Sequence, residues 1–275
     1  FPYTTLFRSH GAVNLILTDD CHLTVPWGIN VKEGDTFTIY AQSTAEASMG
    51  KLTACLPELS DHEKSVWPVA GLSGIGAGVR VWAANDNYYE NEGTIIINGG
   101  NIHARGQQGS SAIGGSYQDR NVSSDGDTPG NLRQGGSITI NGGTVKASSD
   151  GDGFGIGGAG VHHTAEMHIT INGGNIETTA NRNNAAIGDK SKQKSSVTIT
   201  DGVVHAVGKG SAAGIGSTGD IRITGGEISA FAEGGGAAIG SIGGVDCKSI
   251  TINGNAIKSI SSKDGACIGA ATRSE

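Results

Sequence analysis

The sequence has little proline, few aromatic residues and little charge, and each shortage excludes a class of protein. Only 5 prolines stand beside 47 glycines, and the glycines keep no three-residue period, which excludes a collagen-like chain. Aromatic residues make up 5%, too few for the aromatic signatures of propeller blades. Charged residues make up 16% with a net charge of −7, so no basic face is visible for nucleic acid. No apolar run approaches the roughly 18 residues of a membrane-spanning helix. We expect no nucleic-acid partner and no membrane span in this segment.

Cysteine is also scarce, and its spacing indicates no metal or redox motif. Cys21, Cys55, Cys247 and Cys267 form no CxxC pair and show no zinc spacing. We expect isolated thiols and assign no disulfide. The apolar share of 36% is lean for a globule with a thick core, but it suits a thin solenoid whose core is one strand deep.

The two ends of the chain differ in character from the rest. Residues 1–9 resemble the translation of a sequencing-adaptor read, and residues 273–275 resemble its reverse complement. We set both aside in predicting the fold and interpret the chain as a metagenomic fragment of a larger protein. On that interpretation, the lack of a starting Met or a signal peptide does not indicate where the protein resides.

What the sequence does contain is an internal repeat. Six segments read Ile or Val, a variable residue, Ile and a polar turn: 95–100, 138–143, 169–174, 197–202, 221–226 and 250–255. A second signature, a small residue followed by Ile-Gly, is centred on Ile113, Ile156, Ile187, Ile215, Ile239 and Ile268. The step from the first signature to the second is always 16 residues, as from Ile97 to Ile113. The gap to the next repeat varies from 8 to 27 residues, so each repeat has a fixed core and one elastic corner.

The fixed core predicts short strands. Side chains alternate along a strand, so the outer residues of Ile-x-Ile point the same way. After an Asn-Gly type of turn, a second strand places two more residues inward. The expected inward columns are Ile102, Val145, Ile176, Val204, Ile228 and Ile257, then Ala104, Ala147, Thr178, Ala206, Ala230 and Ser259. The Ala-Ile-Gly element makes a third, short side.

Three short sides per turn predict an all-β fold, a right-handed parallel β-helix in the form of a three-sided solenoid. We expect a single domain over residues 10–272, with irregular rungs over 10–92 and regular repeats over 93–272. Identical residues then lie above one another, so isoleucine stacks on isoleucine. The column of Asn98, Asn141 and Asn172 predicts an asparagine ladder, in which each amide bonds to the next rung.

The run from Val13 to Gly76, followed by the Ile-Thr-Ile-Asn-Gly-Gly and Ala-Ile-Gly repeats, resembles the β-helical repeat regions of cell-surface proteins from Gram-positive gut anaerobes. It is more loosely similar to calcium-associated carbohydrate-binding β-helix proteins, a likeness that implies an acidic polysaccharide ligand. Those proteins carry repeated Asp-Gly-Ile-Asp elements where this chain has Ala-Ile-Gly, so their calcium sites do not transfer to it.

Insertions in solenoids collect on one face and often form its binding surface, so we look for function in the elastic corner. Aromatic rings flank carboxylates there, and this combination suits stacking on sugar faces and bonding to sugar hydroxyls. The predicted glycan-binding residues are Trp82, Asp86, Tyr88, Tyr89, Tyr117, Asp119 and Arg120. The alternative is that Trp82 packs against a rung and the tyrosines cover the loop.

Two Asp-Gly stretches offer oxygen atoms of the kind that calcium binds. They contain Asp125 and Asp127, and Asp150 and Asp152. Neither matches the EF-hand or the nonapeptide calcium repeat, and Asp-Gly is also a common turn dipeptide. We expect no cofactor, with calcium as the alternative.

One outward column brings Lys146, Glu177 and His205 onto adjacent rungs. These side chains supply an acid/base set of the kind a polysaccharide lyase needs. The same column also reads as a cross-strand charge ladder of modest energy.

The sequence therefore favours a non-enzymatic carbohydrate-binding or adhesion region, with a polysaccharide or glycan as partner. We expect it to belong to a bacterial extracellular or cell-surface protein. One alternative is a β-helix polysaccharide lyase or glycoside hydrolase that uses Lys146, Glu177 and His205. The other is a passive stalk.

Overall fold

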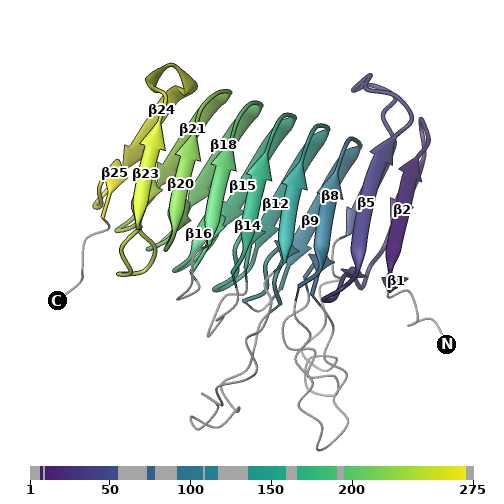
Figure 1. The fold of residues 1–275 in the computed structure, drawn as a ribbon, viewed down its shortest axis with the longest axis horizontal. Coiled ribbons are helices and arrows are strands. Elements are labelled where there is room, and N and C mark those ends of the chain that lie inside the picture. The colour runs from purple at the N-terminus through teal and green to yellow at the C-terminus, as the bar shows by residue number, and fades with distance from the viewer. Residues whose placement is uncertain are drawn as a thin grey trace, which may run out of the picture.

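The structure is a computed structural model. It describes residues 10–54, 73–77, 92–107, 109–116, 136–158, 166–190 and 195–270, together with the backbone of residues 7–8. Within these residues the chain coils through three parallel sheets, which we call sheets A, B and C, and each turn of the coil contributes one strand to each sheet. Figure 1 shows the rungs side by side along one long axis, with the first rung at the right and the last at the left.

In order along each sheet, the described strands are as follows. Sheet A has nine: β1 (Phe7–Arg8), β4 (Ile29–Asn30), β7 (Ile75–Gly76), β10 (Ile113–Gly114), β13 (Ile156–Gly157), β16 (Ala185–Asp189), β19 (Ala213–Ser217), β22 (Ile239–Gly240) and β25 (Ile268–Gly269). Sheet B has eight: β2 (Ala12–Leu17), β5 (Thr36–Ala41), β8 (Thr94–Ile97), β11 (Ser137–Ile140), β14 (His168–Ile171), β17 (Ser196–Ile199), β20 (Asp220–Ile223) and β23 (Ser249–Ile252). Sheet C has eight: β3 (His22–Thr24), β6 (Lys51–Ala54), β9 (Asn101–Gly106), β12 (Thr144–Ser149), β15 (Asn175–Ala180), β18 (Val203–Gly208), β21 (Glu227–Ala232) and β24 (Ile257–Ser262).

The prediction of a three-sided parallel β-helix is confirmed. The rungs stack in the predicted register, for example Ile113 on Ile156 and Ile156 on Ile187. The right-handed sense in the prediction is the one that crossovers between parallel strands adopt in nearly all proteins. A 3-10 turn, η1 (Gly254–Ala256), interrupts the strands in the last rung. No helix in the described part of the chain is both long and apolar enough to cross a membrane.

The core is a column of stacked aliphatic side chains between the three sheets. Ile138, Ile140, Ile169 and Ile171 are each 0% exposed, as their alternation predicts. Each fully buried side chain of this size contributes about 1.5–3 kcal/mol of hydrophobic free energy. The predicted inward Thr178 is also buried, and its hydroxyl donates to the carbonyl of Ala186 at 2.9 Å, so its polar atom is satisfied.

Close packing between rungs requires the glycine in most of the Ile-Gly pairs, although Gly269 in the last rung has open space. Gly114 has a φ of +121°, and a Cβ there would lie 1.9 Å from the carbonyl oxygen of Gly157. No side chain fits at that distance, and the backbone conformation itself disfavours one. The Ile-Gly repeat is thus a steric requirement of sheet A as well as a core element.

The irregular front part, expected over residues 10–92, also forms rungs. Strands β2 and β3 belong to one rung, and β5, β6 and β7 contribute to the next. Phe7 and Arg8, which the sequence analysis sets aside, pair as β1 with Ile29 and Asn30. A sheet edge offers backbone hydrogen bonds to any extended segment, so this pairing needs little from the side chains.

The last rung departs from the predicted register. A bulge follows Ile257, so Ser259 pairs with Ser229 and Ile260 pairs with Ala230. The prediction that Ser259 occupies the small inward column is therefore wrong, and Ile260 takes that place. One extra residue in a strand shifts every later side chain to the other face.

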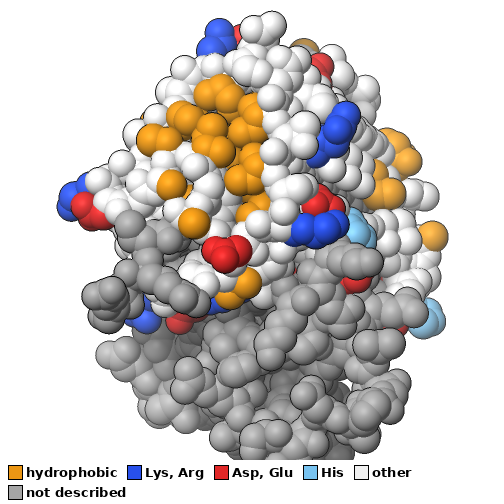
Figure 2. Space-filling model, turned by 60° about the vertical axis from the view of Figure 1, so that its left-hand side comes forward, with side chains coloured by type: hydrophobic (Ala, Val, Ile, Leu, Met, Phe, Trp, Pro, Cys, Tyr) orange, Lys and Arg blue, Asp and Glu red, His pale blue; other side chains and the backbone are white. Residues whose placement is uncertain are grey.

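The end of the solenoid formed by the last rung is apolar. Hydrophobic side chains gather over this end in Figure 2. Ile250, Ile252, Ile257 and Ile260 are partly buried against the core, and Ile268 is 47% exposed. These residues continue the inward columns, and within the described chain no further rung stacks on them.

Candidate functional site

An unbroken row of polar side chains runs along the edge where sheet B turns into sheet C. We call Asn98, Asn141, Asn172 and Thr200 the asparagine edge. The side-chain nitrogen of Asn141 donates to the amide oxygen of Asn98 at 2.7 Å, and that of Asn172 donates to Asn141 at 2.9 Å. The hydroxyl of Thr200 donates to the amide oxygen of Asn172 at 2.8 Å. The predicted asparagine ladder is confirmed and is one rung longer than predicted.

The ladder has a direction because every donor points toward the preceding rung. The chain of hydrogen bonds therefore ends at Asn98, whose side-chain nitrogen is used by no hydrogen bond among the described residues. Asn141, Asn172 and Thr200 are exposed along the edge. An amide nitrogen carries two donor hydrogens and an amide oxygen accepts twice, so the edge retains hydrogen-bonding capacity for a ligand.

An exposed aromatic ring lies at the end of this row. Tyr40 follows Ile39 just as Asn98 follows Ile97, and those two isoleucines pair across β5 and β8. The backbone N–H of Asn98 donates to the carbonyl of Ile39 at 2.8 Å, which fixes the step between the rungs. Tyr40 is 41% exposed, and Ile16, its partner in β2, is 64% exposed.

Tyr40, Ile16 and the asparagine edge together form a surface with an apolar end and a polar run. From Tyr40 to Thr200 the row spans about 19 Å at about 4.8 Å per rung. A ring with a hydroxyl at its tip offers both an apolar face and a polar contact, while the amides offer donors and acceptors in a straight line. This combination can bind an extended ligand that has apolar faces and many hydroxyl groups.

The predicted acid/base column lies on the outer face of sheet C. Lys146 pairs with Glu177, and Glu177 pairs with His205, so the structure places the three residues on adjacent rungs. The ammonium of Lys146 is 3.0 Å from a carboxylate oxygen of Glu177, and both side chains are more than half exposed. The ring of His205 packs against Phe231 with centroids 5.2 Å apart. These contacts have the form of a cross-strand ladder on an open face.

Basic side chains continue along the same face toward the first rung. His103 pairs with Lys146, and His22 pairs with Lys51 in the neighbouring column. The pKa of His103 is lowered, chiefly by burial and then by the positive charges of Lys51, Lys146 and His22, while Glu177 acts in the opposite direction. The predicted set held Lys146, Glu177 and His205, and the basic residues of the front rungs, Lys51 and His22, were not predicted.

The two predicted calcium ligands that the structure describes have protein partners. Asp150 forms an ion pair with Arg105 at 2.7 Å, and Asp152 accepts a hydrogen bond from Asn183 at 2.9 Å. No three His, Cys, Asp or Glu side chains converge to hold a metal ion among the described residues. The calcium proposal for Asp150 and Asp152 is left without a ligand cluster in this part of the chain.

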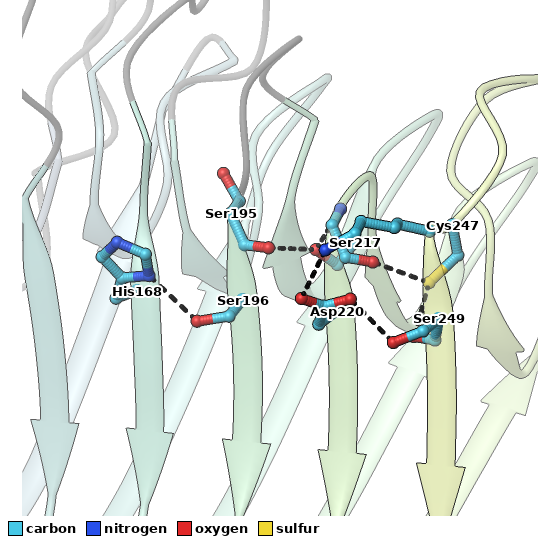
Figure 3. Close-up of polar contacts among 9 residues, drawn as sticks. His168, Ser195, Ser196, Ser217, Asp220, Cys247 and Ser249 are labelled. Atoms are coloured by element: carbon cyan, nitrogen blue, oxygen red, sulfur yellow. Dashed lines mark hydrogen bonds and ion pairs between the residues drawn. The ribbon is translucent and has the colours of Figure 1, made fainter.

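A second polar row, shown in Figure 3, lies where the chain enters the sheet B strands. The Nδ1 atom of His168 is 2.9 Å from the hydroxyl of Ser196, and its Nε2 atom is 3.7 Å from Glu166. The connectivity is that of a Ser-His-acid set, which the sequence analysis missed because the residues lie on different rungs. His168 is 52% exposed and Glu166 40%, and this open position favours a solvated polar pairing over an activated nucleophile.

The same row ends at a thiol that is held in its protonated form. Cys247 donates to the carbonyls of Gly219 and Ser249 at 3.1 and 3.2 Å, and burial raises the pKa of the Cys247 thiol. Asp220 accepts hydrogen bonds from Ser249 at 2.7 Å and from Lys248 at 3.2 Å. Cys21, Cys247 and Cys267 are free thiols. A raised pKa makes a poor nucleophile, so we assign Cys247 a packing role.

Most of the predicted corner residues lie outside the described part of the chain. These are Trp82, Asp86, Tyr88, Tyr89, Tyr117, Asp119, Arg120, Asp125 and Asp127.

The geometry defines the class of protein: a three-sided parallel β-helix solenoid with long polar columns on its outer faces. A family model described as a beta helix repeat matches residues 95–117, 138–160, 169–189 and 197–220, about a third of the chain. No curated protein and no solved structure gives a significant match. The matched segments coincide with the third to sixth rungs, which carry the asparagine edge.

Proposed function

We propose that this β-helix is an extracellular carbohydrate-binding region of a bacterial surface or secreted protein. The observation that carries the proposal is the asparagine edge ending beside the exposed ring of Tyr40. The proposed contact stacks a sugar ring on Tyr40 and Ile16. The hydroxyls of the sugar accept from the amide nitrogen of Asn98, which is unused among the described residues, and exchange hydrogen bonds with Asn141 and Asn172.

The shape of the edge supports a linear polysaccharide over a small sugar. The ladder holds each amide in place through its neighbour, so a ligand meets donors that are already ordered and little side-chain entropy is lost on binding. A straight, regularly spaced row suits a polymer with a regular repeat. The predicted corner residues, if they contact the same polymer, extend this surface without replacing it.

The test is affinity electrophoresis of the whole chain through gels containing plant, mucin or bacterial polysaccharides. We expect retardation by at least one neutral polymer. Tyr40→Ala should weaken that binding about tenfold, because stacking a sugar on an aromatic ring contributes about 1 kcal/mol or more of binding free energy. Tyr40→Phe should keep most of it.

A matched control comes from the same sheet. Thr251 is an exposed residue of β23, far along the solenoid, so Thr251→Ala should bind as the wild type does. Equal losses for Tyr40→Ala and Thr251→Ala contradict the proposed site. No retardation by any polymer favours a passive stalk, and release of sugar products favours a lyase or hydrolase that uses Lys146, Glu177 and His205. Loss of binding in chelator supports calcium in the Asp-Gly corners.

A further inference from the structure

The outer face of sheet C carries a group of basic side chains over its first four rungs. We call His22, Lys51, His103 and Lys146 the cationic cluster. His22 and Lys51 stack in one column, and Thr53, His103 and Lys146 stack in the adjacent one. Lys51 pairs with Asn101, two residues from His103 on the same strand, so the cluster is continuous across the two columns.

The positive charges of this cluster act on a common point. Lys51, Lys146 and His22, from β6, β12 and β3, all lower the pKa of His103 on β9, after the larger effect of its burial. Glu177, on β15, acts in the opposite direction and raises it. Charges on four neighbouring strands therefore converge on His103, on a chain whose net charge is −7.

Two carboxylates near the cluster in the described part of the chain, those of Glu177 and Asp150, are already engaged. Glu177 holds Lys146 at 3.0 Å, and Asp150 holds Arg105 at 2.7 Å. His22 contacts the hydroxyl of Thr53 at 2.9 Å, a neutral partner. The ammonium of Lys51 makes no ion pair within the described residues. Among the described residues, the cluster thus has one more lysine than its carboxylates balance. It also contains His103, whose protonation adds a further positive charge.

We propose that the cationic cluster binds the anionic groups of an acidic polysaccharide, with a carboxylate or sulfate placed between Lys51 and His103. Charge complementarity favours an anionic ligand, and the flat, open face of sheet C suits an extended chain better than a compact molecule. The inference deepens the proposed carbohydrate-binding function and rests on it. The two surfaces use different elements: the asparagine edge follows the ends of the sheet B strands, whereas the cluster lies on the face of sheet C.

An anion bound here changes the protonation of His103. A negative charge stabilises the imidazolium, which the cluster otherwise disfavours, so the pKa of His103 rises when the anion binds. By linkage, binding tightens as the pH falls through the range in which His103 takes up its proton. The charged groups that act on His103 in the described structure include Lys51, Lys146 and His22, and the opposing carboxylate of Glu177. Salt weakens the binding because the face is open to solvent.

The experiment compares four probes against the whole chain by affinity electrophoresis: polygalacturonate, dextran sulfate, neutral dextran and duplex DNA. Polygalacturonate and dextran sulfate separate a carboxylate from a sulfate preference, and duplex DNA serves as a polyanion of a different class. We expect retardation by at least one acidic polysaccharide. It should be stronger at about pH 5.5 than at about pH 7.5, because histidine is mostly neutral at the higher pH. Lys51→Gln should weaken this binding about tenfold, the change expected from one charge-assisted hydrogen bond.

The matched control is Lys258→Gln, because Lys258 lies on the same sheet and pairs with Glu227 at 3.4 Å in the last rungs. It should leave binding unchanged, and both variants should unfold at the wild-type urea concentration. The inference is overturned if the two lysine variants weaken binding equally or if Lys51→Gln has no effect. It is also overturned if duplex DNA retards the protein as much as the acidic polysaccharide does. Binding to neutral polymer tests the proposed function separately. It should be lost in Tyr40→Ala and kept in Lys51→Gln.

Discussion

The amide nitrogen of Asn141 lies 2.7 Å from the amide oxygen of Asn98, although the two residues are 43 positions apart in the sequence. The register of sheet B is kept between them, with Ile138 paired to Ile95 and Ile140 paired to Ile97. The fixed part of each repeat therefore determines what its outer columns present, whatever the length of the corner.

Replacing Asn141 with alanine should destabilise the protein modestly. The change removes two side-chain hydrogen bonds, to Asn98 and from Asn172. Because the edge is exposed, the expected loss is about 1 kcal/mol for the pair. Urea unfolding measures it, and Asn14→Ala, on an exposed Asn of β2, should cost less than about 0.5 kcal/mol. A cost for Asn14→Ala as large as that for Asn141→Ala would show that the ladder adds no stability.

Replacing Ile156 with alanine should be far more damaging. Ile156 is 0% exposed and stacks between Ile113 and Ile187, so the smaller side chain leaves a cavity on both sides. The expected loss of unfolding free energy is about 2–5 kcal/mol. Ile16→Ala, at a residue 64% exposed, serves as the comparison and should stay within about 0.5 kcal/mol. Similar losses for the two variants would argue against the stacked core.

A side chain at Gly114 should be poorly tolerated. Gly114→Ala puts a Cβ against the backbone of Gly157 and also strains a φ of +121°, so the rungs must separate to admit it. We expect loss of at least about 3 kcal/mol, or failure to fold. Gly254→Ala has open space and should behave as the wild type. Thermal melting by circular dichroism compares them, and an unchanged midpoint for Gly114→Ala would contradict the close packing of sheet A.

The lowered pKa of His103 predicts a specific dependence of stability on pH. The unfolded chain has the ordinary histidine value of 6.5, and the folded protein binds the proton more weakly. Above that pH both states are neutral and His103 contributes nothing. As the pH falls below it, the unfolded state takes up the proton first and stability declines, until folded His103 also protonates. His103→Gln should lack this part of the decline in urea unfolding, and an identical pH profile would refute the assignment.

Much of the fold could be predicted because its rules are local and repeated. The Ile-x-Ile alternation and the constant step from Ile97 to Ile113 determine strand direction, register and core. The bulge after Ile257 could not be predicted, because it depends on how one rung settles against its neighbour. The residue pattern of one repeat is compatible with a strand that has the bulge and with one that lacks it.

The candidate site was less accessible to sequence reasoning. The asparagine column was visible as the same residue type at the same position of successive repeats. Tyr40, in contrast, lies in an irregular rung, and only the pairing of Ile39 with Ile97 places it at the end of the ladder. The cationic cluster likewise depends on the pairing of β6 with β9 across a long insertion, which sets Lys51 beside Asn101, two residues from His103. An alignment of the front rungs to the regular repeats is the signal that would have found both.

The most direct test of the proposed function is a side-chain amide NMR titration of the whole chain with oligosaccharides cut from a polymer that retards it. The account predicts that the amide signal of Asn98 shifts most, with smaller shifts at Asn141 and Asn172, and that all three shifts vanish in Tyr40→Ala. Signals of the asparagine edge that stay unmoved while binding persists would contradict it.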